Sequence, residues 1–366
     1  MKVAVVVGTR PEVIKMAPVL RALRERGAPG LLVHTGQHYS AELAARLFRE
    51  LELPDPDLNL GVGSGSGARQ LGRVLRRIEP VLRRERPDVV LVEGDTNSVL
   101  AAALAAQTLG LRIGHVEAGL RSGDRTMPEE TNRILTDHLA TDLFAPTDAA
   151  RRNLCREGID RARIHVTGNT VVDELLRQLP LARAEGAPAR FGVERGGYAL
   201  ATMHRPASVE RLGTLRDLLA GLARAGRALR RPVLMSLHPR TARRIAQAGL
   251  RPRGPVRLMP ALGYRAFLGL LEGAALVLTD SGGLQEEACA LRVPCVTLRD
   301  STERPESVEV GANALAGSDP SRIVARAREM VARPRTWPNP YGDGRAGARI
   351  VDLLLGAVLR SPARGA

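Results

Sequence analysis

The chain has 366 residues, 44% of them hydrophobic, which is enough to form two ordinary cores. No apolar run approaches ~18 residues and the N-terminus enters a strand-like segment directly, so we expect a soluble, cytoplasmic protein without a membrane segment. The three cysteines lack metal-ligand spacing, so we expect neither a disulfide nor a metal site. The net charge of +15 comes from arginines spread over nearly every helical segment with few aromatics between them, which excludes a stacking site for nucleic acid and indicates a general basic surface.

The first half of the chain alternates between short apolar runs and segments with helical spacing. Residues 3–7 are typical of a buried strand, and after a Gly8-Thr9 turn the spacing of Val13, Met16 and Val19 predicts a helix. The alternation continues with helices at residues 70–84 and 98–109 and with strands at residues 89–92 and 113–116. This pattern predicts the α/β class, with a parallel sheet covered by helices.

The turn after the first strand is a candidate anion site. It exposes backbone N–H groups at the start of a helix, with Arg10 and Lys15 close by. Lysine occurs only as Lys2 and Lys15, and arginine is used elsewhere, so we expect that position 15 requires a compact ammonium group. The alternative for Arg10 is a solvated arginine in the first turn of the helix.

Three carboxylates, Asp95, Glu117 and Glu129, follow apolar runs or lie in loops. Asp95 ends the strand-like VVLVEGDT, and Glu117 follows the strand in RIGHVEAG. Because the carboxyl ends of neighbouring parallel strands face one crevice, these acids are expected to converge on one ligand. The alternative is that Asp95 caps the helix that begins near Ser98, while Glu117 and Glu129 are solvated loop charges.

A second alternation of strands and helices follows a stretch rich in Pro, Gly, Ala and Arg at residues 179–195, which is the candidate linker. We therefore expect a first domain over residues 1–178 and a second over residues 190–345, with a ligand in the cleft between them. Residues 346–366 should form a last helix that packs back on the first domain.

The segment LTDSGGLQEEA, residues 278–288, is the densest signal of the second half. An apolar strand ends at Ser281, Gly282 and Gly283, where the N-terminus of the next helix would face a phosphate. Glu287 follows by about one and a half turns, where a carboxylate can accept two hydrogen bonds from ribose hydroxyls. A serine N-cap followed by favourable acids explains the same residues without a ligand.

Several motifs together resemble the non-hydrolysing UDP-N-acetylglucosamine 2-epimerases over nearly the whole chain. They are GTRPEVIKMAP, TGQH, GDTNS, HVEAGLRS, MPEETNR, the His204-Arg205 pair, TDSGGLQEEA and TERPE, in the family's order. The resemblance implies an α/β fold of two Rossmann-like domains facing a cleft, the glycosyltransferase B architecture. It also implies interconversion of UDP-GlcNAc and UDP-ManNAc, with release of UDP, by a homodimer that uses neither a cofactor nor a metal.

The resemblance assigns roles to residues that match the family's motifs. The catalytic residues would be Asp95, Glu117, Glu129 and His204. Contacts to the substrate and to UDP would come from Arg10, Lys15, Arg205, Phe267, Ser281, Gly282, Gly283, Glu287 and Arg304.

The chain departs from the family's pattern in two places. Ala207 stands where the family has glutamate, which puts one contact of the second domain in doubt. Tyr39 and Ser40 do not match the residues of members that a second UDP-GlcNAc activates, so we expect no such activation.

The implied chemistry asks for acid/base groups on opposite faces of the sugar. Loss of UDP from C1 acidifies the C2 proton, so anti elimination gives 2-acetamidoglucal, and re-addition from the other face inverts C2. Other functions remain open: epimerisation of another UDP sugar such as a diacetamido uronic acid, hydrolysis that releases ManNAc, a nucleotide-sugar-binding regulator, or a glycosyltransferase. A regulator should have lost one of the three acids, and no acceptor site for a glycosyltransferase is apparent.

Overall fold

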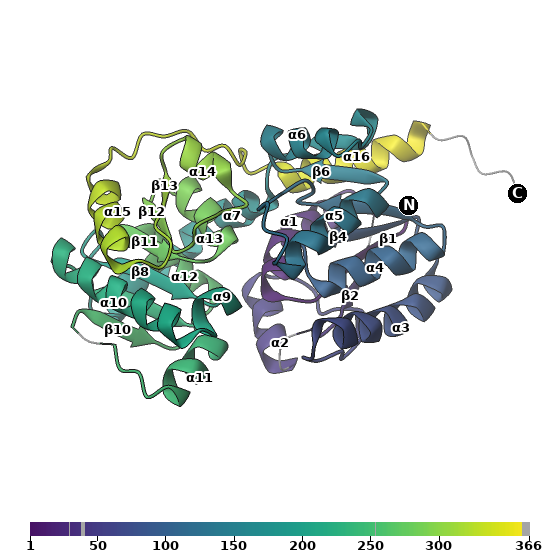
Figure 1. Ribbon diagram of the computed structural model, residues 1–366. Coiled ribbons are helices and arrows are strands. Elements are labelled where there is room, and N and C mark those ends of the chain that lie inside the picture. Colours follow the sequence, from purple (N-terminus) through teal and green to yellow (C-terminus); the bar gives the residue numbers. More distant parts are fainter. Residues whose placement is uncertain (29, 38–40, 253, 361–366) are drawn as a thin grey trace, which may run out of the picture. The chain divides into compact units, whose positions relative to one another are not determined.

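The computed structural model describes residues 1–28, 30–37, 41–252 and 254–360 (Figure 1). Two compact units divide the chain: unit 1 comprises Met1–Glu174 and Tyr341–Ala366, and unit 2 comprises Leu175–Pro340. Each unit is an α/β layer structure around its own parallel sheet, as the alternation of strands and helices predicted. Tyr39 and Ser40, on which the expectation about activation depends, lie outside the described residues.

Unit 1 contains a seven-stranded sheet in the order β3-β2-β1-β4-β5-β6-β7, and the neighbouring strands pair in parallel. The strands are β1 (Val3–Val7), β2 (Gly30–His34), β3 (Leu58–Asn59), β4 (Val89–Glu93), β5 (Arg112–Val116), β6 (Asp142–Ala145) and β7 (Ile164–Val166). The helices are α1 (Arg10–Glu25), α2 (Ala41–Glu50), α3 (Gly67–Glu85), α4 (Asn97–Thr108), α5 (Pro128–Leu139), α6 (Asp148–Arg156) and α16 (Ala346–Arg360), with a short 3-10 turn at Arg161–Arg163.

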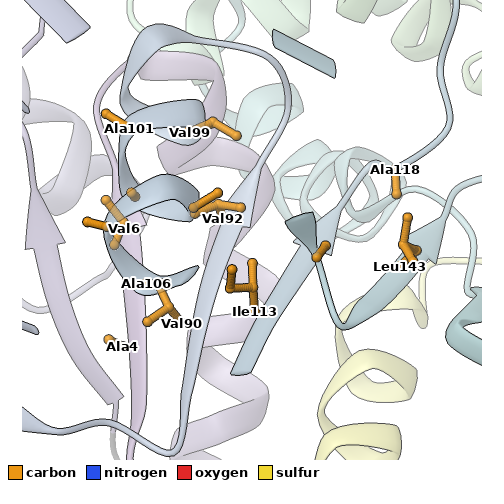
Figure 2. Packing of buried hydrophobic residues seen from close by; sticks show 14 of the residues in the cluster. Ala4, Val6, Val90, Val92, Val99, Ala101, Ala106, Ile113, Ala118 and Leu143 are labelled. Carbon is orange, nitrogen blue, oxygen red and sulfur yellow. The ribbon is translucent and has the colours of Figure 1, made fainter. Parts of the chain in front are cut away.

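The core of unit 1 lies where β1, β4 and β5 meet α4. β1 and β4 are buried along their whole length, which explains why both read as continuous apolar runs. Figure 2 shows Val6, Val90 and Val92 of these strands beside Val99 and Ala101 of α4. α4 is apolar on all sides because it also packs against α3 and α5. This packing fixes the strand ends that carry Glu93, Asp95 and Glu117.

Unit 2 repeats the design with a six-stranded parallel sheet in the order β10-β9-β8-β11-β12-β13. The strands are β8 (Ala199–Met203), β9 (Val233–Leu237), β10 (Val256–Met259), β11 (Leu276–Thr279), β12 (Cys295–Thr297) and β13 (Asn313–Leu315). The helices are α8 (Ala187–Arg190), α9 (Pro206–Val209), α10 (Leu212–Leu229), α11 (Pro239–Gln247), α12 (Tyr264–Gly273), α13 (Gly282–Ala290), α14 (Pro305–Glu309) and α15 (Pro320–Ala332). In both units the order of the strands reverses beside the first strand, and α/β proteins bind ligands at such a point.

The division between the units at residue 174 falls within α7 (Thr170–Ala184). Residues 179–195, which we expected to be a linker, contain the end of α7 and the short α8. The chain returns to unit 1 at Tyr341, whose carbonyl accepts the Asn169 N–H at 2.8 Å. α16 then packs on α1, where the backbone of Pro18 lies 2.8 Å from the place that a Cβ at Gly347 would occupy. Only glycine permits the two helices to approach so closely.

The described residues contain no helix that is both long and apolar enough to cross a membrane. The three cysteines are all described and are free, with Cys289 and Cys295 buried and Cys155 partly exposed.

Candidate active site

Asp95 lies in the turn between β4 and α4, where Arg133 of α5 forms an ion pair with its carboxylate. The side-chain amide of Asn132 donates to the Asp95 carbonyl at 2.9 Å. Thr96, not Asp95, is the N-cap of α4, because its hydroxyl accepts the Val99 N–H. The capping alternative for Asp95 is therefore wrong. Its carboxylate is instead held by a cation from another helix.

Glu117 follows β5 and is 7% exposed, so it is not the solvated loop charge of the alternative. Lys15 of α1 forms an ion pair with its carboxylate, and the Asn169 amide donates to the same oxygen at 3.2 Å. Its φ of 68° lies in the left-handed region, which costs a residue with a Cβ roughly 1–2 kcal/mol. A charged residue held in a strained backbone by two partners is characteristic of a functional site.

Lys15 serves a second carboxylate as well. Its ammonium lies 3.1 Å from Glu93, the last residue of β4, whose side chain is almost fully buried. Burial raises the pKa of Glu93 well above its ordinary value, Lys15 opposes that rise and Glu117 adds to it. Two carboxylates thus share one buried ammonium, which stabilises the ionised form of each.

The turn between β1 and α1 differs from the expected anion site. The Gly8 N–H, which we expected to face a phosphate, donates to the Glu12 carboxylate at 2.6 Å, and the Thr9 hydroxyl donates to its other oxygen at 3.0 Å. The carboxylate of Glu12 therefore occupies the position in this turn where we expected a bound anion. Arg10 is the first residue of α1 and is partly exposed, beside the turn.

The buried acid at position 12 predicts a pH-dependent stability. Burial raises the pKa of Glu12 from 4.5 to about 7, although hydrogen bonds from Thr96 and Gly8 act in the opposite direction. Because the unfolded chain releases this proton at a lower pH than the folded protein, the stabilisation is complete below pH 4.5 and is lost as the pH rises towards 7. Compared with the Glu12→Gln variant, the wild type should lose about 2 kcal/mol of unfolding free energy between about pH 5.5 and about pH 8. Urea unfolding of both proteins measures this, and equal pH dependence in the two would contradict it.

Glu129 lies in the first turn of α5 and is partly exposed. The structure gives it no hydrogen bond or ion pair with another described residue. Its neighbour Glu130 is buried and accepts hydrogen bonds from the backbone of Ser122 at 3.0 Å and Gly123 at 2.9 Å. Arg133 joins Glu130 to Asp95, so α5 carries the cation that holds Asp95.

In unit 2, His204 and Arg205 follow β8 and are organised by one buried acid, Asp280, which follows β11. The His204 ring lies 3.0 Å from the carboxylate, and the backbone N–H of Arg205 donates to it at 2.9 Å. Although burial alone would raise the pKa of Asp280, His204 and the surrounding donors hold that pKa below its ordinary value. The acid therefore stays ionised and fixes the His204 ring, whose side chain is 39% exposed.

α13 begins at Gly282, and the Ser281 hydroxyl caps it by accepting the Leu284 N–H, as the capping alternative proposed. No neighbouring atom lies within 4 Å of the place that a Cβ at Gly283 would occupy, so the helix terminus is open on that side. At Gly282 the same position would lie 2.6 Å from the Glu303 carboxylate. The helix terminus is thus both a capped structural element and an accessible set of N–H donors.

The other predicted contacts of unit 2 lie around this helix. Glu287 accepts a hydrogen bond from the Tyr264 hydroxyl of α12 at 3.1 Å. Phe267 lies on the same helix, α12, and is partly exposed. Arg304 is buried and lies 2.6 Å from the Glu286 carboxylate. Arg205 lies 2.5 Å from Glu303, so acids from the chain orient both arginines.

The structure therefore forms two groups of predicted residues. Lys15 and Glu117 are in contact in unit 1, with Asp95 on the adjacent strand end. In unit 2, His204 and Arg205 contact Asp280, and Ser281 directly follows Asp280 in the chain. The residues that hold these groups were not predicted from the sequence, although Glu93 directly precedes the motif GDTNS and Arg133 is the last residue of MPEETNR. The missed residues are Glu12, Glu93, Glu130, Arg133, Asn169, Asp280, Glu286 and Glu303. Within the described part of the chain, no group of three or more His, Cys, Asp and Glu is arranged to hold a metal ion.

Comparison with known proteins gives consistent matches along the chain. A family model described as UDP-N-acetylglucosamine 2-epimerase matches residues 21–355. The UDP-N-acetylglucosamine 2-epimerase of Methanocaldococcus jannaschii is 46% identical over 361 residues, which cover 97% of this chain and 99% of that protein. The UDP-2,3-diacetamido-2,3-dideoxy-D-glucuronate 2-epimerase of Pseudomonas aeruginosa is 39% identical, with 97% of this chain and 99% of that protein covered.

A solved structure agrees with these matches. The crystal structure of the M. jannaschii UDP-GlcNAc 2-epimerase in complex with UDP-GlcNAc and UDP is similar to this chain with a TM-score of 0.92 and 45% sequence identity. The similarity covers 97% of this chain and 100% of that one. The chain thus has the fold of a known nucleotide-sugar enzyme.

Proposed function

Because the chain belongs to the UDP-N-acetylglucosamine 2-epimerase family, we propose that it interconverts UDP-GlcNAc and UDP-ManNAc by inverting C2 of the sugar. The observation that carries this proposal is the pair of acids at the carboxyl ends of β4 and β5. Arg133 of α5 pairs with Asp95, and Lys15 of α1 pairs with Glu117, so these two acids, which follow adjacent parallel strands, have different cationic partners. Two acids with separate surroundings suit the two faces of one carbon.

The reaction proceeds by elimination and re-addition. As the C1–O bond to UDP breaks, charge at C1 acidifies C2, and one carboxylate removes the C2 proton to give 2-acetamidoglucal and UDP. UDP then adds back at C1 while an acid on the other face delivers a proton to C2. Asp95, Glu117 and Glu129 supply these acid/base groups, and His204 stabilises the departing diphosphate.

UDP binding is assigned mainly to unit 2. The open N-terminus of α13, with Ser281, Gly282 and Gly283, offers N–H donors to the diphosphate. Glu287, oriented by Tyr264, accepts the ribose hydroxyls, and Phe267 lies beside the uracil. Arg205 and Arg304 supply positive charge from unit 2, and Arg10 and Lys15 supply it from unit 1.

The reaction needs no cofactor, and the active form is proposed to be a homodimer in the cytoplasm. The chief alternative substrate is a UDP-diacetamido uronic acid, on which the 39% identical relative acts by its name. UDP-GlcNAc is favoured because the relative named for it is 46% identical. Proton NMR of the purified protein with UDP-GlcNAc and no additive tests the proposal. UDP-ManNAc signals support it, free ManNAc indicates a hydrolysing enzyme, and no change contradicts it.

UDP binding should stabilise the protein against heat. Since UDP binds the folded state only, a concentration of about 100 times its Kd adds about 2.7 kcal/mol of stability and raises Tm. Glu287→Ala removes the ribose acceptor and should weaken UDP binding about tenfold or more, because charge-assisted hydrogen bonds contribute about 1.5–3 kcal/mol. Thermal unfolding with and without UDP measures both effects.

The control for this measurement is Glu329→Ala, which removes an exposed acid of α15 that pairs with Arg326 and Arg333. This variant should show the same Tm increase with UDP as the wild type. An unchanged wild-type Tm at millimolar UDP, or an equal loss of UDP affinity in both variants, would contradict the assignment of Glu287.

A further inference from the structure

The buried ring of His115 connects two turns of unit 1 that carry the proposed acid/base groups. His115 lies in β5, two residues before Glu117, and is fully buried. Its Nε2 lies 2.8 Å from the carbonyl oxygen of Gly94, the residue directly before Asp95. Its Nδ1 lies 2.7 Å from the Asp137 carboxylate of α5.

Asp137 holds the other side of the Glu117 turn. Its second carboxylate oxygen accepts the Gly119 N–H at 3.1 Å, and Arg121 lies 2.7 Å from the same oxygen. Asp137 is fully buried; burial alone would raise its pKa, but His115 and Arg121 lower that pKa below its ordinary value. Asp137 therefore contacts the chain two residues before Glu117 and two residues after it.

The hydrogen-bond roles in this cluster are restricted. The Gly94 carbonyl can only accept, and an ionised Asp137 can only accept, so both ring nitrogens of His115 must donate. A neutral ring has one N–H and would leave one of these buried contacts without a proton. The geometry therefore corresponds to a ring with two protons, balanced by the carboxylate.

We propose that His115 and Asp137 are positioning residues: they hold the turns that carry Asp95 and Glu117 at one spacing, although neither touches the substrate. This inference rests on the proposed function, because it concerns acids that act on one carbon. Glu117 has a left-handed backbone with a φ of 68°, so its position depends on contacts outside its own residue. An acid displaced by about 1 Å can lose about a hundredfold in rate.

Asp137→Asn is the sharpest test of this proposal. The asparagine side chain has one acceptor oxygen, so its amide NH₂ must face either the His115 ring or the Gly119 N–H and Arg121. One of the two contacts to the Glu117 turn is therefore lost without a change in volume. We expect kcat for UDP-GlcNAc to fall about 10–100-fold, while KM and the affinity for UDP change by less than about threefold.

His115→Gln provides a conservative partner variant. The glutamine amide can still donate where the ring Nε2 donates, so the Gly94 contact survives while the Asp137 contact is lost. We expect a smaller fall in kcat than for His115→Ala, again at nearly constant KM. Equal kcat values for the glutamine and alanine variants would contradict the role assigned to the Gly94 contact.

Two matched controls separate positioning from general stability. Asp142→Asn breaks the ion pair with Arg112 at the other end of β5, where the two side chains lie 2.7 Å apart. His34→Gln changes a buried histidine of β2 that contacts Phe48. Both variants should lower Tm but leave kcat within about twofold of the wild type, because neither residue holds an acid-bearing turn.

NMR of protein labelled with ¹⁵N-histidine supplies a readout that does not depend on activity. The His115 ring should show N–H protons directed at both Gly94 and Asp137, assigned by their absence in His115→Gln, and a ring with only one such proton would overturn the hydrogen-bond scheme. Wild-type turnover is measured first. If it is absent, the proposed function fails and the positioning role fails with it. If the wild type is active and Asp137→Asn matches it in kcat, the positioning role alone is overturned.

Discussion

Glu117→Gln is expected to lower the turnover of UDP-GlcNAc by about a hundredfold or more, the loss typical of a missing acid/base group. Glutamine keeps the size of the side chain and can still accept from Asn169, so the turn after β5 should remain in place. Lys15 retains Glu93 as a partner, so no buried cation is left unpaired. The variant therefore loses proton transfer rather than its fold.

Asp95→Asn should cause a loss of similar size for the same reason. Its partner Arg133 keeps a second carboxylate, Glu130, at 2.7 Å, so the start of α5 should be preserved. UDP affinity should change by less than about threefold in both variants, because the proposed UDP contacts lie mainly in unit 2. Steady-state turnover followed by NMR, together with UDP titration by calorimetry, separates the two quantities.

The matched control for Glu117→Gln is Glu85→Gln, which removes a surface glutamate of unit 1 that also pairs with a lysine. Glu85 lies 2.8 Å from Lys2, at the end of α3. Loss of such a surface pair should change stability little and leave turnover within about twofold. Near-normal turnover in both Glu117→Gln and Asp95→Asn would remove these acids from the mechanism.

The strands and helices of both units could be predicted from the sequence because the spacing of apolar residues along the chain indicates which elements are buried and on which faces. β1 and β4 are buried on both faces and read as continuous apolar runs, and the helix expected at residues 98–109 is α4 (Asn97–Thr108). The Ser281 cap was equally readable, because an N-cap depends on residues within one turn. Features that depend on residues close together in the sequence, such as these elements and this cap, were therefore predictable.

The partners of the acids could not be predicted in this way. The Lys15–Glu117 pair joins positions 102 residues apart, and the Asn169–Glu117 hydrogen bond joins positions 52 residues apart. The order of the strands in the sheet brings these residues together, and this order cannot be derived from a single sequence. Glu12 was missed for another reason: an acid in the first turn of a helix usually faces solvent, whereas here tertiary packing buries it against Gly8.

The course of the chain between the units shows a third kind of difference. We expected residues 179–195 to be a linker because they are rich in Pro, Gly, Ala and Arg, and proline usually ends a helix. α7 nevertheless continues past Pro180, and Pro188 lies at the start of α8, where its missing N–H is not needed. α8 packs on α12. Tertiary contacts therefore stabilise helical structure in a segment whose composition does not favour it.

Epimerisation in D₂O should place deuterium at C2 of the UDP-ManNAc that forms, and prolonged incubation should label UDP-GlcNAc as well. Inversion requires that one group removes the C2 proton from one face and that another group delivers a proton to the opposite face. The delivering group takes its proton from solvent between turnovers, so the original proton does not return to the product. Proton NMR shows the label as loss of the H2 signal and collapse of its coupling to H1.

The same experiment locates the acids. In Glu117→Gln and Asp95→Asn, formation of UDP-ManNAc should fall by about a hundredfold or more, since inversion needs a group on each face of C2. Exchange at C2 of UDP-GlcNAc should fall as far in the variant that lacks the group that removes its proton. In Glu85→Gln both rates should remain within about twofold of the wild type. Exchange that persists in one variant while epimerisation stops would identify the remaining acid as the one that removes the proton from UDP-GlcNAc. UDP-ManNAc that keeps protium at C2 in D₂O would exclude elimination with separate acid and base groups, and with it the roles proposed for Asp95 and Glu117.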